Sequence, residues 1–291
     1  MSASLDPARR RFEALARGPD DALDLEEAAI LIAAEEYPEL DVEAVRGELD
    51  ELGEAARERL PEPSALGDCV AEFNRFLFRE QGFCGADEYY DPRNSYLNEV
   101  LSRRRGIPIT LSLVYMGVGR RAGLDARGIS FPGHFLVRCK GPESGPGKRP
   151  GGPDADDCIV DAFHGRTLSQ EDCEARLGDA LGVGAVFDPA VHLRDAAPRE
   201  ILVRMLSNLQ RIFAESGDFE RLLSCCDRIL LLTPEEPQAL RERSMVYERL
   251  GWLAPAIADL ETSLALLPEG EIARSVRARR DALRSQRGPL H

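Results

Sequence analysis

Residues 94–138 read NSYLNEVLSRRRGIPITLSLVYMGVGRRAGLDARGISFPGHFLVR, and the string IVDAFHGR follows at 159–166. The spacing of apolar residues in the first string predicts a helix near Tyr96–Arg103. A second helix is predicted over Pro108–Ala122, where the residues are apolar on nearly every side, which is typical of a buried helix. This pair of helices is the starting point for predicting the fold.

Two short apolar runs after the helices predict strands, FLVRC at 135–139 and CIVDAF at 158–163. Nine of the thirteen residues at 141–153 are Gly or Pro, which predicts a surface loop within the segment 140–157. The strands are too short to form separate domains, so we expect the loop to join neighbouring strands of one sheet. A buried helix against a small antiparallel sheet defines an α+β core.

Helical patterns flank this core on both sides. Apolar residues recur at helical spacing from about Ala22 to Leu60 and again over 66–81. The chain is therefore predicted to divide into a helical N-terminal subdomain (1–81), the α+β core (82–195) and a helical C-terminal region (196–291).

The C-terminal region repeats itself with a period of 34 residues. Gly217 and Gly251 are 34 apart, and so are Pro234 and Pro268. Glycine permits a tight turn between helices, and proline ends a helix. This pattern resembles tetratricopeptide (TPR) repeats, which implies helical hairpins with a groove for a protein partner.

Composition limits the classes of function. The 291 residues include 37 basic and 51 acidic side chains, a formal net charge of −14, which disfavours nucleic-acid binding. The longest uncharged, mostly apolar run, Gly106–Gly119, is too short to span a bilayer, and Met1–Arg17 lacks the apolar stretch of a secretory signal. We expect a cytoplasmic protein whose seven cysteines, which include no CxxC pair, are reduced and mostly buried.

The core contains one pair of residues typical of catalysis. His134 enters the first strand and Asp161 lies in the second, and neighbouring strands can bring an imidazole and a carboxylate together. A buried His–Asp pair can equally do no more than satisfy its own polar groups. The spacing alone leaves both interpretations open.

The strings RNSYLNEVL, RGIPITLSLVY, PGHFLVR and VDAFHG together resemble the transglutaminase-like core of the bacterial SirB-type family, over roughly residues 20–270. The resemblance implies a papain- or transglutaminase-like fold with a nucleophilic cysteine at the start of a buried helix, a histidine and an aspartate. His134 and Asp161 match the last two. Pro108 occupies the position of the cysteine and cannot act as a nucleophile, and GIP is the reading that the resemblance implies for this branch.

Three other residues are candidate nucleophiles. Thr110 and Ser112 lie within about a turn of Pro108, although their hydroxyl groups can simply bond to helix carbonyls. Cys84 lies in a turn-rich segment that can fold over the site, although an incidental thiol is the simpler interpretation.

The remaining candidates concern ligand binding. Arg105 ends a basic run that suits either a solvated helix end or an anion clamp. His164 is expected in the turn that ends the second strand, where it can reach His134. Metal ligands would have to come from separate positions such as these histidines and Asp161, and no zinc-ligand spacing occurs, so we expect neither a metal nor another cofactor.

Two main hypotheses follow. The first is a non-catalytic (pseudo-enzyme) transglutaminase-like protein that binds a protein partner through the TPR-like helices or the core cleft and acts in regulation. The alternative is a cysteine-dependent acyl transferase, peptidase or amidase that uses His134 and Asp161. A non-enzymatic small-ligand binder is a third hypothesis, and the sequence does not specify the partner or the oligomeric state.

Overall fold

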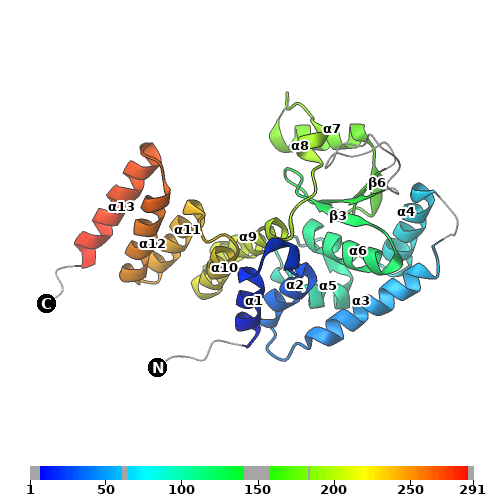
Figure 1. Ribbon diagram of the computed structural model, residues 1–291, viewed down its shortest axis with the longest axis horizontal. Helices are drawn as coiled ribbons and strands as arrows, with labels where there is room; N and C mark the ends of the chain where they lie inside the picture. Colours follow the sequence, from blue (N-terminus) through cyan, green and yellow to red (C-terminus); the bar gives the residue numbers. More distant parts are fainter. Residues whose placement is uncertain (1–6, 61–64, 141–156, 183, 288–291) are drawn as a thin grey trace. The chain divides into compact units, whose positions relative to one another are not determined.

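The computed structural model describes residues 7–60, 65–140, 157–182 and 184–287. These residues form two compact units (Figure 1). Unit 1 comprises Met1–Leu15 and Asp20–Ile201, and unit 2 comprises Ala16–Pro19 and Leu202–His291. The predicted N-terminal subdomain and α+β core lie almost wholly in unit 1. The three-part division stays a prediction.

The N-terminal part of unit 1 is helical, as its apolar periodicity predicts. Asp24 and Asp41 begin two of the helices by accepting hydrogen bonds from backbone N–H groups of the first turn. The longest of these helices, α3, packs against the buried helix of the core. The elements are α1 (Pro7–Arg17), η1 (Asp20–Ala22), α2 (Leu25–Ala34), α3 (Val42–Arg57), α4 (Leu66–Asn74) and the π-helix η2 (Arg75–Glu80).

The predicted buried helix is confirmed as α6 (Pro108–Ala122). Its proline occupies the first helical position, where the missing N–H costs nothing. Gly123 ends it with φ of +93°, a conformation that favours glycine. Around the start of α6 lie β1 (Cys84–Gly85), the 3-10 helix η3 (Pro92–Ser95), α5 (Leu97–Arg103) and β2 (Arg105–Gly106), and β1 and β2 pair in parallel.

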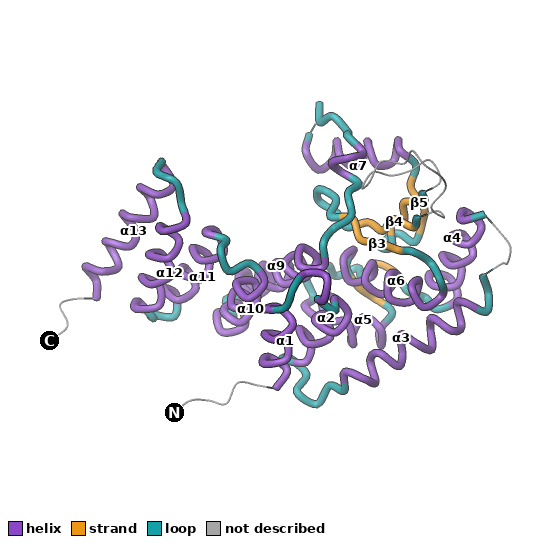
Figure 2. Tube along the Cα trace, in the orientation of Figure 1, coloured by secondary structure: helices purple, strands orange, loops and turns teal. Residues whose placement is uncertain are grey.

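The core sheet is antiparallel, in the order β3-β4-β5-β6 (Figure 2). The two predicted strands are confirmed as β4 (Leu136–Cys139) and β5 (Cys158–Asp161). The edge strands β3 (Ala126–Ile129) and β6 (Arg166–Leu168) were not predicted, because each is too short and polar to show alternation. The glycine- and proline-rich stretch predicted as a loop lies mostly outside the described residues.

The two faces of this sheet pack against different helices. Ile129, Leu136, Ile159 and Leu168 form a core cluster with residues of α7 (Gln170–Leu181). Val137 and Cys139 alternate with Leu136 and therefore point to the other face of the sheet. Helix α6 packs on that face (Figure 1). Asp161 shares the parity of Ile159 and therefore lies on the α7 face. The short helix α8 (Pro189–His192) follows α7.

Unit 2 has the helical hairpins that the 34-residue period predicts. Gly217 and Gly251 both adopt positive φ, +73° and +75°, in the turns between helices. Successive helices from α10 onward pack against one another, and α12 and α13 share a core cluster that includes Leu260 and Leu283. The helices are α9 (Pro198–Ser216, which begins in unit 1), α10 (Phe219–Leu232), α11 (Pro237–Arg249), α12 (Leu253–Leu266) and α13 (Glu271–Arg287).

None of the described helices combines the length and the apolar character that crossing a bilayer requires.

Candidate functional site

Asp161 is the centre of a polar cluster at the end of β5. Its carboxylate accepts from His134 Nε2 at 3.0 Å through Oδ1, and from His164 Nδ1 at 2.7 Å through Oδ2. Arg176 Nη2 donates to Oδ2 at 2.6 Å. An ionised carboxylate only accepts hydrogen bonds, so the imidazole nitrogen facing it carries a proton in each histidine. We call these four side chains the Asp161 cluster.

The local sequence explains how two of these residues meet. The backbone N–H groups of Phe163 and His164 donate to Asp161 Oδ1 at 3.1 and 3.2 Å, so the chain turns around its own carboxylate. Gly165, with φ of +65°, continues this turn. The turn folds the His164 ring back onto Asp161, three residues before it. His134 belongs to a different segment of the chain and lies two residues before the start of β4.

The partners of Asp161 also determine its ionisation. Burial alone raises the pKa of this carboxyl group, but the hydrogen bonds from His134 and His164 and the charge of Arg176 outweigh that effect. The pKa of Asp161 is therefore held well below its ordinary value. The group is a carboxylate at physiological pH although its side chain is fully buried.

The two imidazoles differ in their access to solvent. The His134 side chain is 9% exposed, whereas that of His164 is 51% exposed. Their rings are stacked, with centroids 6.0 Å apart, and the Phe163 ring stands edge-on to both. The cluster is thus buried on the His134 side and open on the His164 side.

Arg176 is the member of the cluster that the sequence did not predict. It lies on α7, next to the buried Leu177, and reaches Asp161 because α7 packs on the same face of the sheet. The only signal in the sequence is the helical spacing of Cys173 and Leu177, which places residue 176 at the edge of the buried side of α7.

At the start of α6, the candidate hydroxyl groups bond to backbone. Thr110 Oγ1 donates to the carbonyl of Asn94 at 2.7 Å and accepts from the N–H of Ile107 at 3.1 Å. Ser112 Oγ donates to the carbonyl of Pro108 at 2.7 Å. These bonds to backbone favour the structural interpretation of both residues over their prediction as nucleophiles.

Cys84 lies in β1, opposite Arg105 of β2. It is partly buried. The N–H of the next residue, Gly85, donates to the carbonyl of Phe163 at 3.1 Å, which brings β1 next to the Asp161 cluster. Arg105 Nη1 donates to the backbone carbonyls of Gly82 and Arg104, at 3.2 and 3.3 Å.

Several other thiols are poor nucleophiles. Burial raises the pKa of Cys139 to about 12 and the pKa values of Cys173 and Cys226 to about 11. The Cys139 sulfur lies 3.7 Å from the hydroxyl oxygen of Tyr115, on the α6 face of the sheet. These cysteines are not activated for attack, because only the thiolate is nucleophilic.

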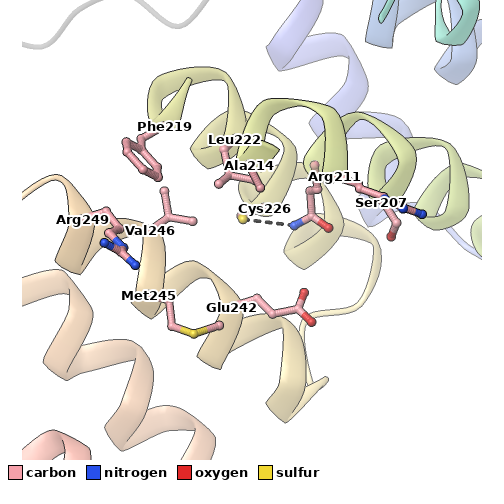
Figure 3. A pocket seen from close by; sticks show the side chains of 11 residues that line it. Ser207, Arg211, Ala214, Phe219, Leu222, Cys226, Glu242, Met245, Val246 and Arg249 are labelled. Carbon is pink, nitrogen blue, oxygen red and sulfur yellow. Dashed lines mark hydrogen bonds between the residues drawn. The ribbon is translucent and has the colours of Figure 1, made fainter. Parts of the chain in front are cut away.

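A second candidate site is a groove in unit 2, between α9, α10 and α11, with a volume of about 620 Å³ (Figure 3). Its apolar lining includes Phe219, Leu222, Met245 and Val246, and the Met245 side chain is 59% exposed. The polar lining residues include Arg211, Glu242 and Arg249. The groove offers an apolar surface bordered by charges, as protein-binding surfaces do.

The model of the transglutaminase-like superfamily matches residues 43–207, more than half of the chain. The chain belongs to the transglutaminase-like superfamily. A tetratricopeptide-repeat model matches residues 209–281, so this transglutaminase-like protein also carries the repeats that the 34-residue period predicted. Transglutaminase-like and TPR domains together support a protein-interaction or regulatory module.

Relatives match along most of the transglutaminase-like chain. A "UPF0162 protein" of Xylella fastidiosa is 39% identical over 283 residues, covering 95% of this chain and 96% of its own. "Protein SirB1" of Salmonella typhimurium is 23% identical over 265 residues, covering 90% of this chain and 94% of its own, and it confirms the SirB-type resemblance. "F-box only protein 21" of Mus musculus is 33% identical over 170 residues, covering 56% of this chain and 25% of its own. No solved structure matches this chain.

Proposed function

We propose that this transglutaminase-like protein is non-catalytic and binds a protein partner through the groove of unit 2, in a regulatory role in the cytoplasm. The observation that carries the proposal is the groove itself. Among its apolar side chains Met245 is exposed and Phe219 is partly exposed, and a side chain such as that of Met245 is stabilised when a partner removes it from water. TPR repeats commonly mediate protein–protein interaction, and the matched TPR segment includes α10 and α11 of the groove.

The start of α6 supports the absence of catalysis. Proline stands at the position that matches the family nucleophile, and the hydroxyl groups of Thr110 and Ser112 are bonded to backbone carbonyls. A nucleophile needs a base within hydrogen-bond reach, and the bonds of these two hydroxyls end on carbonyls instead. On this proposal the pair of His134 and Asp161 has a structural or binding role.

Site-specific photo-cross-linking tests the groove. A photoreactive aromatic residue in place of Met245 is expected to form a discrete adduct with one protein in the cells that produce this chain. The matched control is Ile272 on α13, which is equally exposed (58%) but is not a lining residue of the groove. Ala214→Asp should abolish the adduct at 245, because it places a charge at an exposed lining residue of the groove without burying that charge in the core. Identical adducts from 245 and 272, or an adduct that survives Ala214→Asp, would overturn the proposal.

The alternative is acyl transfer by Cys84, and the hydrogen bond between Gly85 and Phe163 favours it by placing β1 beside the cluster. Iodoacetamide labelling with peptide mapping separates the two functions. We expect no cysteine whose rate of alkylation depends on His134. A fast-reacting Cys84 that slows in His134→Ala, but not in the control His192→Ala, would overturn the non-catalytic proposal and favour the cysteine-dependent enzyme.

Installing the missing nucleophile provides a positive control for that assay. Pro108→Cys is expected to add a reactive thiol at the start of α6, where a helix N-terminus favours the thiolate. The alkylation rate of this thiol is the reference rate for an activated cysteine in this protein. The rate of every natural cysteine can be compared with it.

A further inference from the structure

We propose that His134, Asp161 and His164 form a binding site for one divalent transition-metal ion of the zinc class. This inference is independent of the proposed partner groove. It replaces the sequence expectation of no metal, which was based on the spacing of ligands along the chain. One potential ligand atom from each residue lies within 4.8 Å of the other two.

The donor set determines the class of metal. Two imidazole nitrogens and one carboxylate oxygen suit Zn²⁺ and neighbouring transition metals. Ca²⁺ and Mg²⁺ prefer oxygen ligands throughout, so this set disfavours them. Three protein ligands leave a coordination position for water or another small ligand.

The proposed ligands are held by structure that does not depend on the metal. The turn after β5 fixes His164 against Asp161 through two backbone hydrogen bonds to Oδ1. Phe163 limits the rotation of both imidazole rings, because its own ring packs edge-on against each of them. Such pre-organisation lowers the entropic cost of collecting ligands from separate segments.

Proton balance is compatible with metal binding. Each imidazole now points a protonated nitrogen at Asp161, at 3.0 Å for His134 and 2.7 Å for His164. A neutral imidazole can carry its proton on the other ring nitrogen, so the nitrogen facing Asp161 can present a lone pair without any net release of protons. The ion then takes the place of the two protons that join the imidazoles to the carboxylate.

Arg176 is the outer partner of the proposed site. Its guanidinium donates to Asp161 Oδ2, and its side chain is 21% exposed. Outer partners of this kind orient a ligand carboxylate. Its positive charge opposes the ion, but the exposed part of the side chain can be solvated, which weakens that repulsion.

Access to the proposed site is through His164. This side chain is 51% exposed, whereas the Asp161 side chain is fully buried. A metal ion can therefore reach the cluster from solvent without unfolding the sheet. Because His164 is half exposed, its replacement is also compatible with folding.

Cobalt titration of the full-length protein, after treatment with EDTA, tests the site. We expect one equivalent of Co²⁺ to bind and to produce the visible absorption of a nitrogen- and oxygen-liganded ion, and one equivalent of Zn²⁺ to displace it. His164→Ala should weaken the binding by about 100-fold or more, because loss of a direct ligand costs at least as much as loss of an outer partner.

The matched control is His192→Ala. His192 is another histidine of unit 1, and its Nδ1 engages the backbone of Asp188 rather than the cluster. It should bind Co²⁺ as the wild type does, and circular dichroism of both variants should report an unchanged fold. Absence of stoichiometric binding, equal binding by His164→Ala, or an intense ultraviolet thiolate-to-cobalt band indicating cysteine ligands would each overturn the proposal.

Discussion

Two charge clusters among the described residues have opposite designs, and each includes a buried carboxylate, Asp161 in unit 1 and Asp259 in unit 2. In unit 1, the carboxylate of Asp161 is surrounded by two imidazoles and the Arg176 guanidinium. In unit 2, the Arg243 guanidinium is surrounded by carboxylates: it donates two hydrogen bonds to Asp259 and one to Asp227, each at 2.8 Å.

The chemistry of the partners distinguishes the two clusters. Arg243 joins α10, α11 and α12 through hydrogen bonds to two carboxylates, and the pair of bonds to Asp259 is bidentate. This arrangement suits a structural link between helices. The imidazoles of unit 1 can lose a proton, move it between ring nitrogens or bind a metal. The chemistry of the partner groups therefore distinguishes a site of potential function from a structural link, although each cluster includes a buried carboxylate.

Replacement of the arginine in unit 2 should have the largest effect on stability. Arg243→Met leaves Asp259, which is only 6% exposed, without either hydrogen bond from the guanidinium. Removing one partner of a buried pair costs about 3–5 kcal/mol, because an uncompensated charge stays behind. We expect loss of that size in the free energy of unfolding of unit 2, measured by hydrogen exchange of amides in α11 and α12.

The double variant Arg243→Met/Asp259→Leu is the control for this prediction. It removes the stranded carboxylate, so it should recover much of the lost protection. If the double variant is as unstable as Arg243→Met, shape rather than charge links these helices, and the contrast between the clusters fails.

Replacement of the central carboxylate in unit 1 should cost less. Asp161→Asn removes the charge that faces three donors, but the amide oxygen of asparagine still accepts hydrogen bonds and Arg176 reaches solvent. We expect a loss of about 2–3 kcal/mol, the scale of hydrogen bonds to a charged group, in the exchange protection of β4 and β5. A loss larger than that of Arg243→Met would mean that the Asp161 cluster is chiefly a structural link.

The two clusters also differ in how far the sequence predicted them. The sequence predicted that His134 and Asp161 could meet, because it places them on neighbouring strands. His134 Nε2 and Asp161 Oδ1 lie 3.0 Å apart. Arg176 could not be predicted because it approaches across the face of the sheet, from a helix whose packing depends on the whole core. The exact return of His164 depends on a turn held by the Asp161 side chain, which apolar periodicity does not report.

The secondary structure was also predictable from the sequence only in part. Long periodic segments, such as α6 and the repeat helices, carried enough apolar residues to be predicted. The edge strands β3 and β6 did not, because their positions follow from pairing with β4 and β5 rather than from their own residues. Short segments take their structure from tertiary neighbours, and the neighbours are not visible in a local pattern.

The smallest predicted effect concerns the aromatic wall of the Asp161 cluster. A Cβ atom added at Gly85 lies 2.6–2.8 Å from three atoms of the Phe163 ring, so Gly85→Ala must displace that ring. Overpacking of this kind costs roughly 1–2 kcal/mol. The ring stands edge-on to both imidazoles, so we also expect binding of Co²⁺ at the proposed site to weaken by about tenfold, as for loss of an outer partner.

The matched control is Gly47→Ala in α3, where no atom lies within 4 Å of the added Cβ. Alanine there should stabilise the helix by about 0.5–1 kcal/mol and leave Co²⁺ affinity unchanged. Urea unfolding measures whether each variant raises or lowers the free energy of unfolding. Equal effects of the two variants on Co²⁺ binding would show that Phe163 does not position the imidazoles, and that their hydrogen bonds to Asp161 do so instead.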